Sequence, residues 1–493
     1  MFLKFVFLAA IILVSVLGIY LFIPPVALLP MYLTIAIIPV VFLILKKNLL
    51  NSLLVWFSLI LFGEVANIPL HSLPDIDPQR MIWFFIFFIL LIEIVFKQRR
   101  IIAGDNKVEI AMILFCVYVL MSMIITGEIY REGHGVFLST FLSGYAIPFS
   151  IFFLGKNLVD NEQKIKRIFI FFTIIGFYLG LTGIFEHFPI LQPLVFPGYI
   201  MNIEMGIHQG RSRGPFLNAS TNGAVIGMIF FMTIYLLFQN YKKWAKRFFI
   251  ISILVMLTTL GFTFTRTPWL AFLLSLCIFP IFFPRIRIVF IISLLVLIVT
   301  IGIYSYSGFK PKWQTEGEGA VRRETTLGGQ LRERTININP IYSRINLYAA
   351  MWRMFLEKPI FGFGFYTFKK FSPPYFYKLE GIPYIGVGEG AGLHDTLGGI
   401  LVELGLVGLG LFLFILFFIL KNSINLYRRL SSESFSKKGL IAVFWGIFII
   451  YMVNIQFIEM QYFMFANSLF FVTGGIIVGL NQTLYGIEKP MRT

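Results

Sequence analysis

The feature that most constrains this 493-residue chain is a series of apolar runs, each about 17–23 residues long, the length an α-helix needs to cross a bilayer. Hydrophobic residues make up 58% of the chain and charged residues only 13%. Soluble domains carry roughly a quarter charged residues, and no soluble fold could bury this much apolar surface. The sequence therefore predicts an all-α polytopic membrane protein.

We expect about fourteen transmembrane helices, within a range of about twelve to fourteen. Lys and Arg gather in the loops after spans 2, 4, 6, 8, 10 and 12 and are sparse in the other short loops, which predicts that the first set and both termini are cytoplasmic. The expected spans are 3–22, 26–45, 49–65, 81–97, 108–126, 137–155, 167–187, 219–239, 248–265, 267–283, 286–306, 398–420, 438–456 and 463–481.

The longest interruption between apolar runs follows span 11 and is therefore expected on the outer face. It divides the chain into a membrane domain at 1–306, an outer loop at 307–397, and three last spans with a cytoplasmic C-terminus at 398–493. Within the loop, residues 307–338 are polar. Over 341–357 apolar residues recur at three- and four-residue steps, which predicts an amphipathic helix lying on the membrane domain or at its interface.

The net charge of +17 follows the loop topology, so we expect membrane lipid and no nucleic acid as a partner. Cys116 and Cys277 both fall inside apolar runs, where their spacing suits neither a disulfide framework nor a thiolate metal site. No cluster of His, Cys and Asp has the spacing of metal ligands, and no glycine-rich phosphate loop is present. We therefore expect no metal and no cofactor.

A first motif, Arg211-Ser-Arg213-Gly-Pro-Phe-Leu-Asn218, lies directly before span 8. A helix start offers free backbone N–H groups and a positive dipole end, and two arginines add to its attraction for an anion. The alternative is an arginine pair at the membrane interface with Asn218 as a helix cap.

Two further motifs fall on the expected outer face. Arg266 stands in the short turn between spans 9 and 10, where a charge at membrane level is costly unless it has a partner or lines a wet cavity; it could also reach to lipid head groups. His394, followed by Asp395, stands where the long loop re-enters the membrane, as a general base or as an interface histidine. Glu403 lies inside the next apolar run, where its cost suggests a function or an arginine partner.

Taken together, two arginine motifs and a histidine on one face suit an anionic, lipid-anchored substrate that reacts outside the cytosol. Here the sequence resembles the O-antigen ligase and polymerase superfamily of bacterial membrane glycosyltransferases. The family's Arg-x-x-Gly-x-Phe-x-Asn pattern is matched at 211–218, and its Ser-Arg-Gly turn at 265–267 with Ser and Gly replaced by Thr. Its outer-loop and closing patterns are matched by Arg344, Trp352, Pro359, Gly362, Gly364, His394, Glu403, Gly405 and Gly408, with Asp395 where Asn is common.

The resemblance covers about 210–410 and implies a C-type glycosyltransferase fold. The implied donor is a glycan on undecaprenyl diphosphate, used without a metal in the bacterial inner membrane, for lipopolysaccharide or another polysaccharide. Arg211 and Arg266 would face the diphosphate, because the arginine fork suits phosphate. Arg213 and Arg344 would assist them, and Asn218, Asp395 and Glu403 would complete the substrate site.

In the same reading, His394 takes the proton of the acceptor hydroxyl, and direct displacement inverts the anomeric centre. The acceptor could be a lipid core or a protein, as for a ligase, or another lipid-linked repeat, as for a polymerase. A transporter or flippase of the same lipid is the alternative of another class, although we see none of the repeated halves that transporters usually have. A membrane scaffold is a third alternative, but a scaffold does not need an arginine such as Arg266 at membrane level.

Overall fold

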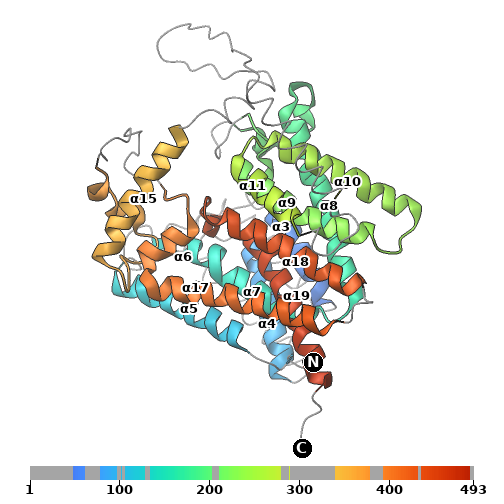
Figure 1. Ribbon diagram of the computed structural model, residues 1–493, viewed down its shortest axis with the longest axis horizontal. Coiled ribbons are helices and arrows are strands. Elements are labelled where there is room, and N and C mark those ends of the chain that lie inside the picture. The colour runs from blue at the N-terminus through green and yellow to red at the C-terminus, as the bar shows by residue number, and fades with distance from the viewer. Residues whose placement is uncertain are drawn as a thin grey trace, which may run out of the picture. The chain divides into compact units, whose positions relative to one another are not determined.

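In the computed structural model, the described residues are 48–61, 78–96, 102, 106–127, 134–202, 210–278, 288, 339–377, 392–430 and 435–488. All regular structure in these ranges is helical, which confirms the predicted class (Figure 1). Three of the expected spans and the polar stretch of the loop lie outside the described residues. They are 3–22, 26–45, 286–306 apart from Ile288, and 307–338.

The helices of the described ranges follow the expected spans closely, and several run past them at one end. They are α3 (Leu49–Ile60), α4 (Pro78–Val95), α5 (Lys107–Ile125), α6 (His134–Phe141), η3 (Leu142–Ala146), α7 (Ile147–Leu158), α8 (Glu162–His187), η4 (Pro189–Leu194), η5 (Gly198–Met201), η6 (Gly214–Phe216), α9 (Ala219–Leu237), α10 (Lys243–Phe262), α11 (Arg266–Leu276), α15 (Asn339–Glu357), α16 (Phe368–Phe371), η8 (Pro373–Tyr375), α17 (Thr396–Arg429), α18 (Phe435–Asn454), η9 (Met460–Tyr462) and α19 (Met464–Glu488).

Seven helical stretches of the described chain are long and apolar enough to cross a membrane. Two shorter apolar helices, Leu49–Ile60 and Lys438–Asn454, accompany them. The seven are Lys107–Ile125, Val136–Leu158, Glu162–His187, Ala219–Leu237, Lys243–Phe262, Thr396–Arg429 and Met464–Thr483. The chain is thus a multi-pass membrane protein.

The chain forms two compact units. One comprises residues 1–57 and 79–100, where the buried Trp56 indole donates to the Gln79 carbonyl at 2.8 Å. The other comprises 58–78 and 101–493 and contains every candidate residue.

Glycines let the helices of the second unit approach each other closely. A Cβ at Gly475 of α19 would lie 2.1 Å from the Phe152 carbonyl oxygen, and one at Gly479 would lie 2.6 Å from that of Lys156 on α7. On α8, a Cβ at Gly180 would meet Val255 of α10 at 2.6 Å. Lipid is as apolar as the helices, so the hydrophobic effect does not drive helices together in a membrane. Small residues at the contacts allow the close backbone packing that stabilises the bundle instead.

One end of this unit, which we call the His394 end, brings together segments far apart in sequence. There α10 joins α11 and α18 joins α19, and α9 and α17 begin. The backbone N–H of Thr396 donates to Ile455 at 2.7 Å, and that of Ser212 donates to Phe262 at 3.1 Å. Helices α9, α11 and α18 pack on one another, so all these termini share one end of the bundle.

Helix α17 is broken at Gly405, which has a φ of 65° and a ψ of −167°. Residues 359–364 dock into the break. Leu406 and Val407 donate to the carbonyls of Pro359 and Ile360 at 2.9 and 3.2 Å, and Phe363 and Gly364 donate to those of Val402 and Glu403 at 3.0 and 2.8 Å. These four bonds satisfy backbone groups that a break in a helix would otherwise leave unpaired.

The docked segment belongs to a small layer built on α17 by α15, α16 and η8 (Figure 1). Helix α15 covers the expected range 341–357, and the segment after it has positive φ at Gly362 and Gly364. The core of the layer consists of Leu347, Met354, Phe363, Phe368, Leu393 and Val402.

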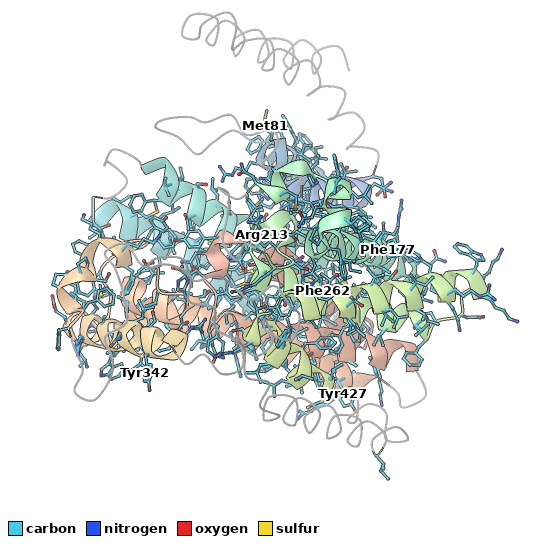
Figure 2. The ribbon with its side chains drawn as sticks, turned by 90° about the horizontal axis from the view of Figure 1, so that it is seen from above. Met81, Phe177, Arg213, Phe262, Tyr342 and Tyr427 are labelled. Carbon is cyan, nitrogen blue, oxygen red and sulfur yellow. The ribbon has the colours of Figure 1, made fainter. Side chains whose placement is uncertain are left out.

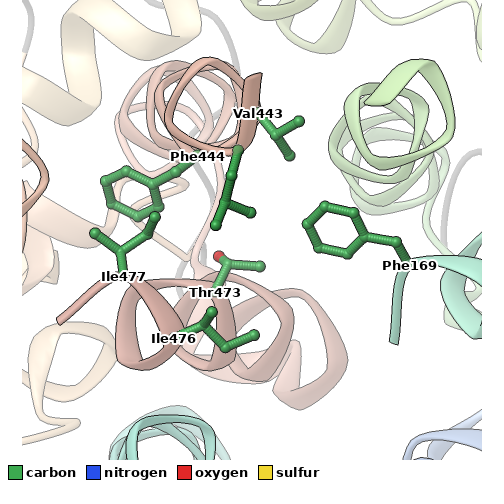
Figure 3. A pocket seen from close by; sticks show the side chains of 7 residues that line it. Phe169, Val443, Phe444, Thr473, Ile476 and Ile477 are labelled. Carbon is green, nitrogen blue, oxygen red and sulfur yellow. The ribbon is translucent and has the colours of Figure 1, made fainter. Parts of the chain in front are cut away.

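A narrow crevice with about 210 Å³ of empty space lies between α8, α18 and α19 (Figure 3). Its wall is apolar apart from Thr473, whose hydroxyl donates to its own helix at Phe470, 2.7 Å away. The crevice is lined from α18 by residues of its first half, away from the His394 end. The lining residues are Phe169, Leu440, Val443, Phe444, Thr473, Ile476 and Ile477.

Candidate active site at the His394 end

The Arg211 motif is tied to the turn that carries Arg266. Beside Arg211, Ser212 is fully buried; its hydroxyl donates to Gly183 at 2.6 Å, and its N–H donates to Phe262 at the end of α10. The side chain of Asn222 donates to the Ser212 carbonyl at 3.1 Å. Arg211 and Arg266 are thus held at the same end of the same helices.

Arg213 holds this segment in place. The Arg213 side chain donates from Nε to Glu186 Oε1 at 3.2 Å, and its guanidinium also donates to the Ile200 carbonyl. The backbone N–H groups of Arg213 and Gly214 donate to Glu186 Oε2 at 2.8 and 2.9 Å. The side chain is buried, in the interior of the helices near Phe262 (Figure 2). In the described structure the charge of Arg213 thus meets a carboxylate of the chain itself.

Asn218 is the N-cap of α9, as the alternative interpretation of the motif expected. Its Oδ1 accepts from the N–H groups of Ser220 and Thr221 at 2.9 and 3.2 Å. Two residues earlier, the ring of Phe216 packs on that of Phe465 at 5.5 Å. Since Phe465 follows the α18–α19 loop, this contact links the Arg211 motif to the loop that holds α17.

Arg266 is the first residue of α11 and is exposed. The turn before it is fixed by the hydroxyls of Thr265 and Thr263, 3.0 Å apart, and by the Trp269 indole, which donates to Leu260 at 2.7 Å. This places a fixed cation at the His394 end.

His394 and Asp395 form the start of α17. Asp395 caps the helix by accepting from the Gly398 N–H at 2.9 Å, a role that Asn fills equally well. The Thr396 hydroxyl donates to Ile458 and accepts from Met460, at 2.7 and 2.8 Å. The His394 side chain, 57% exposed, therefore projects from a firmly held helix start.

The surrounding groups partly desolvate the His394 imidazole, which lowers its pKa, and the charges of Arg344 and Lys369 lower it further. The imidazole is therefore neutral at neutral pH, the form that can accept a proton. For Asp395, burial raises the pKa, against the opposing effects of its backbone hydrogen bonds and Arg344.

Arg344 of α15 connects the motifs. It lies over the ring of Phe457 at 5.0 Å. Burial lowers its pKa; the nearby Tyr348 and Asp395 raise it, and Arg266 lowers it. Arg266, Arg344 and His394 thus form a chain of groups whose charges act on one another.

Glu403 holds the docked segment. Its Oε2 accepts from the Tyr366 N–H at 2.8 Å and its Oε1 accepts from the Phe368 N–H at 3.0 Å. The side chain is buried, and its two oxygens bond to backbone. The expected arginine partner is absent from these contacts, and Glu403 acts on the site by fixing residues 366–368.

Sequence reasoning missed Glu459 and Lys369. The Glu459 carboxylate lies 3.9 Å from His394 Nδ1, which is longer than a hydrogen bond. Burial raises the pKa of Glu459, and Lys369 and the backbone N–H groups of Leu393 and His394 lower it. A carboxylate in a short loop between two spans at the expected outer face was the available signal. Among the described residues, no three His, Cys, Asp or Glu side chains gather closely enough to hold a metal.

Comparison with known proteins gives one family. Residues 251–413 match the family model described as O-antigen ligase, a range that contains Arg266, Arg344, His394, Asp395 and Glu403. No curated protein matches the chain significantly. Residues 251–413 are therefore similar to the O-antigen ligase superfamily, which is the resemblance expected from the motifs.

Proposed function

We propose that the chain is an inverting, metal-independent glycosyltransferase of the bacterial inner membrane. It moves a glycan from an undecaprenyl-diphosphate donor to an acceptor hydroxyl on the outer face. The observation that carries this proposal is the position of Arg344, which interacts electrostatically with Arg266 and with His394 at the end of the helices where the Arg211 motif is held.

In the proposed reaction, neutral His394 removes the proton of the acceptor hydroxyl as its oxygen attacks the anomeric carbon. The bond from that carbon to the phosphate oxygen breaks on the opposite side, and the leaving diphosphate takes the electron pair. General base catalysis of this kind contributes about 10²–10⁴-fold. Arg211 and Arg266, with Arg344, stabilise the growing charge; losing one preorganised donor of this kind costs about 3–4 kcal/mol.

A polymerase, whose acceptor is a second lipid-linked repeat, would use the same groups. A transporter is less well supported, because the unwound helices of transporters line their substrate site. The break in α17 is instead filled by residues 359–364 of the chain itself. The backbone groups at the break therefore form hydrogen bonds with the docked segment.

The test uses the purified protein in liposomes with lipid-linked repeat units, with and without a lipid-core acceptor. We expect His394→Ala and Arg266→Gln to lose at least about 100-fold in transfer. Arg247→Gln, an exposed arginine at the other end of α10, is the matched control and should keep wild-type transfer. Elongation without the core acceptor would identify a polymerase. Full transfer by His394→Ala would refute the mechanism, and lipid movement without transfer would support a transporter.

A further inference from the structure

A second set of groups meets His394 from elements other than those that carry the arginines. Glu459 is the N-cap of η9, and Tyr462 ends that short helix, with its N–H donating to the Glu459 carbonyl at 3.2 Å. Residues three apart in a 3₁₀-helix lie above one another. The Glu459 carboxylate also acts electrostatically on the Tyr462 side chain, so the two groups are neighbours.

The docked segment supplies the rest of this set. The ring of Tyr366 meets the ring of Tyr462 edge to face at 6.1 Å, and it also packs against the ring of Phe137 at 5.0 Å. Tyr366 has a φ of 63°, and its N–H donates to Glu403, so its position is fixed by the docking on α17. Lys369, three residues later and exposed, acts electrostatically on both His394 and Glu459.

The composition of this set differs from that of the arginine set. It offers a partly exposed aromatic face (Tyr462 is 39% exposed), one carboxylate as acceptor and one ammonium as donor. A pyranose ring has apolar C–H faces and hydroxyl groups that both donate and accept, so these groups complement it. A diphosphate would be repelled by Glu459.

Building on the proposed function, we infer that His394, Glu459, Lys369, Tyr366 and Tyr462 form the acceptor subsite, and that its ligand is a saccharide. The ring of the acceptor sugar packs on Tyr462, and Glu459 accepts a hydrogen bond from a hydroxyl of that sugar. The attacking hydroxyl then reaches His394, 3.9 Å from the carboxylate. Both a lipid-core saccharide and a second lipid-linked repeat present this chemistry.

The test separates the Michaelis constant (KM) of the acceptor from the turnover number (kcat) in two arms. One arm uses the lipid-core saccharide as acceptor, and the other uses excess lipid-linked repeat. We expect Tyr462→Leu to raise the acceptor KM about tenfold, with kcat and donor KM little changed. Tyr462→Phe keeps the ring and should restore the acceptor KM. Tyr241→Leu, between α9 and α10 at the other end of the bundle, is the matched control.

Hydrolysis of the donor, in which water takes the place of the acceptor hydroxyl and undecaprenyl diphosphate is released, distinguishes the two proposals, because it needs the donor site and His394 but not the rest of the acceptor subsite. We expect Tyr462→Leu to retain this release and Arg266→Gln to lose it. An unchanged acceptor KM in Tyr462→Leu would overturn the subsite while leaving the transferase intact. Transfer to protein side chains that is indifferent to Tyr462 would overturn the saccharide assignment. Full transfer by His394→Ala would remove the basis of both.

Discussion

His394 has a φ of 54°, in the left-handed region that residues other than glycine rarely occupy. Such a conformation costs about 1–2 kcal/mol and persists only where the surroundings determine it. Here Leu393 is buried before it, Asp395 caps the helix after it, and Glu459 accepts from the backbone N–H groups of Leu393 and His394. His394 is thus positioned by its own backbone, and its side chain stays available to act as the proposed base.

A substitution at Lys369 tests how a neighbouring charge affects the pKa of His394. Its positive charge lowers the pKa of His394, so Lys369→Gln should raise that pKa. Because the base acts only when neutral, activity is lost as pH falls through its pKa. The acid limb of the profile of kcat/KM against pH should therefore move to higher pH. Lys370→Gln is the matched control, with its ammonium 4.8 Å from the ring of Phe371. A limb that stays in place or moves to lower pH would contradict this account.

The sequence alone pointed to most of the candidate residues, but it did not predict which groups they contact. Arg266 and His394 stand out because a charge or a titrating group at the edge of an apolar run is costly. Arg213 looks equivalent to Arg211 in the motif, yet it pairs with Glu186, 27 residues away in sequence. Such a pairing depends on how α8 and the segment before α9 fold together, which no local pattern encodes.

The helix that determines the geometry of the site is α17. Its 34 residues would extend about 51 Å as a regular helix, against about 30 Å of hydrocarbon core. The break at Gly405 separates the first nine residues, which follow directly on His394 and Asp395 and include Glu403, from the longer remainder. The Tyr118 hydroxyl of α5 donates to the Leu404 carbonyl at 2.9 Å and thereby satisfies another group at the break.

Gly405 is the residue on which the docking depends. A Cβ there would lie 2.2 Å from the Ile360 carbonyl oxygen, and the positive φ adds a cost of about 1–2 kcal/mol. Gly405→Ala should therefore lower the melting temperature (Tm) and reduce transfer, because residues 366–369 lose their support. Gly410→Ala is the matched control on the same helix, since nothing lies within 4 Å of its Cβ. Thermal unfolding and transfer assays should separate the two; equal behaviour would contradict the assigned role.

The hydropathy pattern predicted well which of the described segments are helices, and it predicted less well where those helices begin and end. It located α9 and α19 within a few residues at their first turns, but it started α10 at 248, whereas the helix begins at Lys243. Lys and Arg favour helices while lowering hydropathy, so a helix that continues past the lipid is cut short by a hydropathy window. The break at Gly405 left no sign, because its apolar neighbours keep the pattern of a continuous span.

In the larger of the two units, the candidate residues share one end and the basic loops are expected at the other. With Cys116 and Cys277 replaced by Ser, cysteines at the exposed Lys370 and Lys243 report on the two ends. A membrane-impermeant maleimide should label Lys370→Cys in intact spheroplasts, and Lys243→Cys only after permeabilisation. The expectation follows from the distribution of Lys and Arg among the loops. The reverse pattern would put His394 in the cytoplasm and overturn the proposed reaction site.

The four backbone bonds between residues 359–364 and α17 have a consequence for engineering this chain. A graft that exchanges the outer layer for that of a relative, but keeps the native α17, joins two surfaces whose donors and acceptors were matched to each other. Buried unmatched amides cost about 1–3 kcal/mol each, so such hybrids should fail to assemble. Swaps that carry residues 359–368 and 402–407 as one cassette keep that match, so such hybrids should assemble.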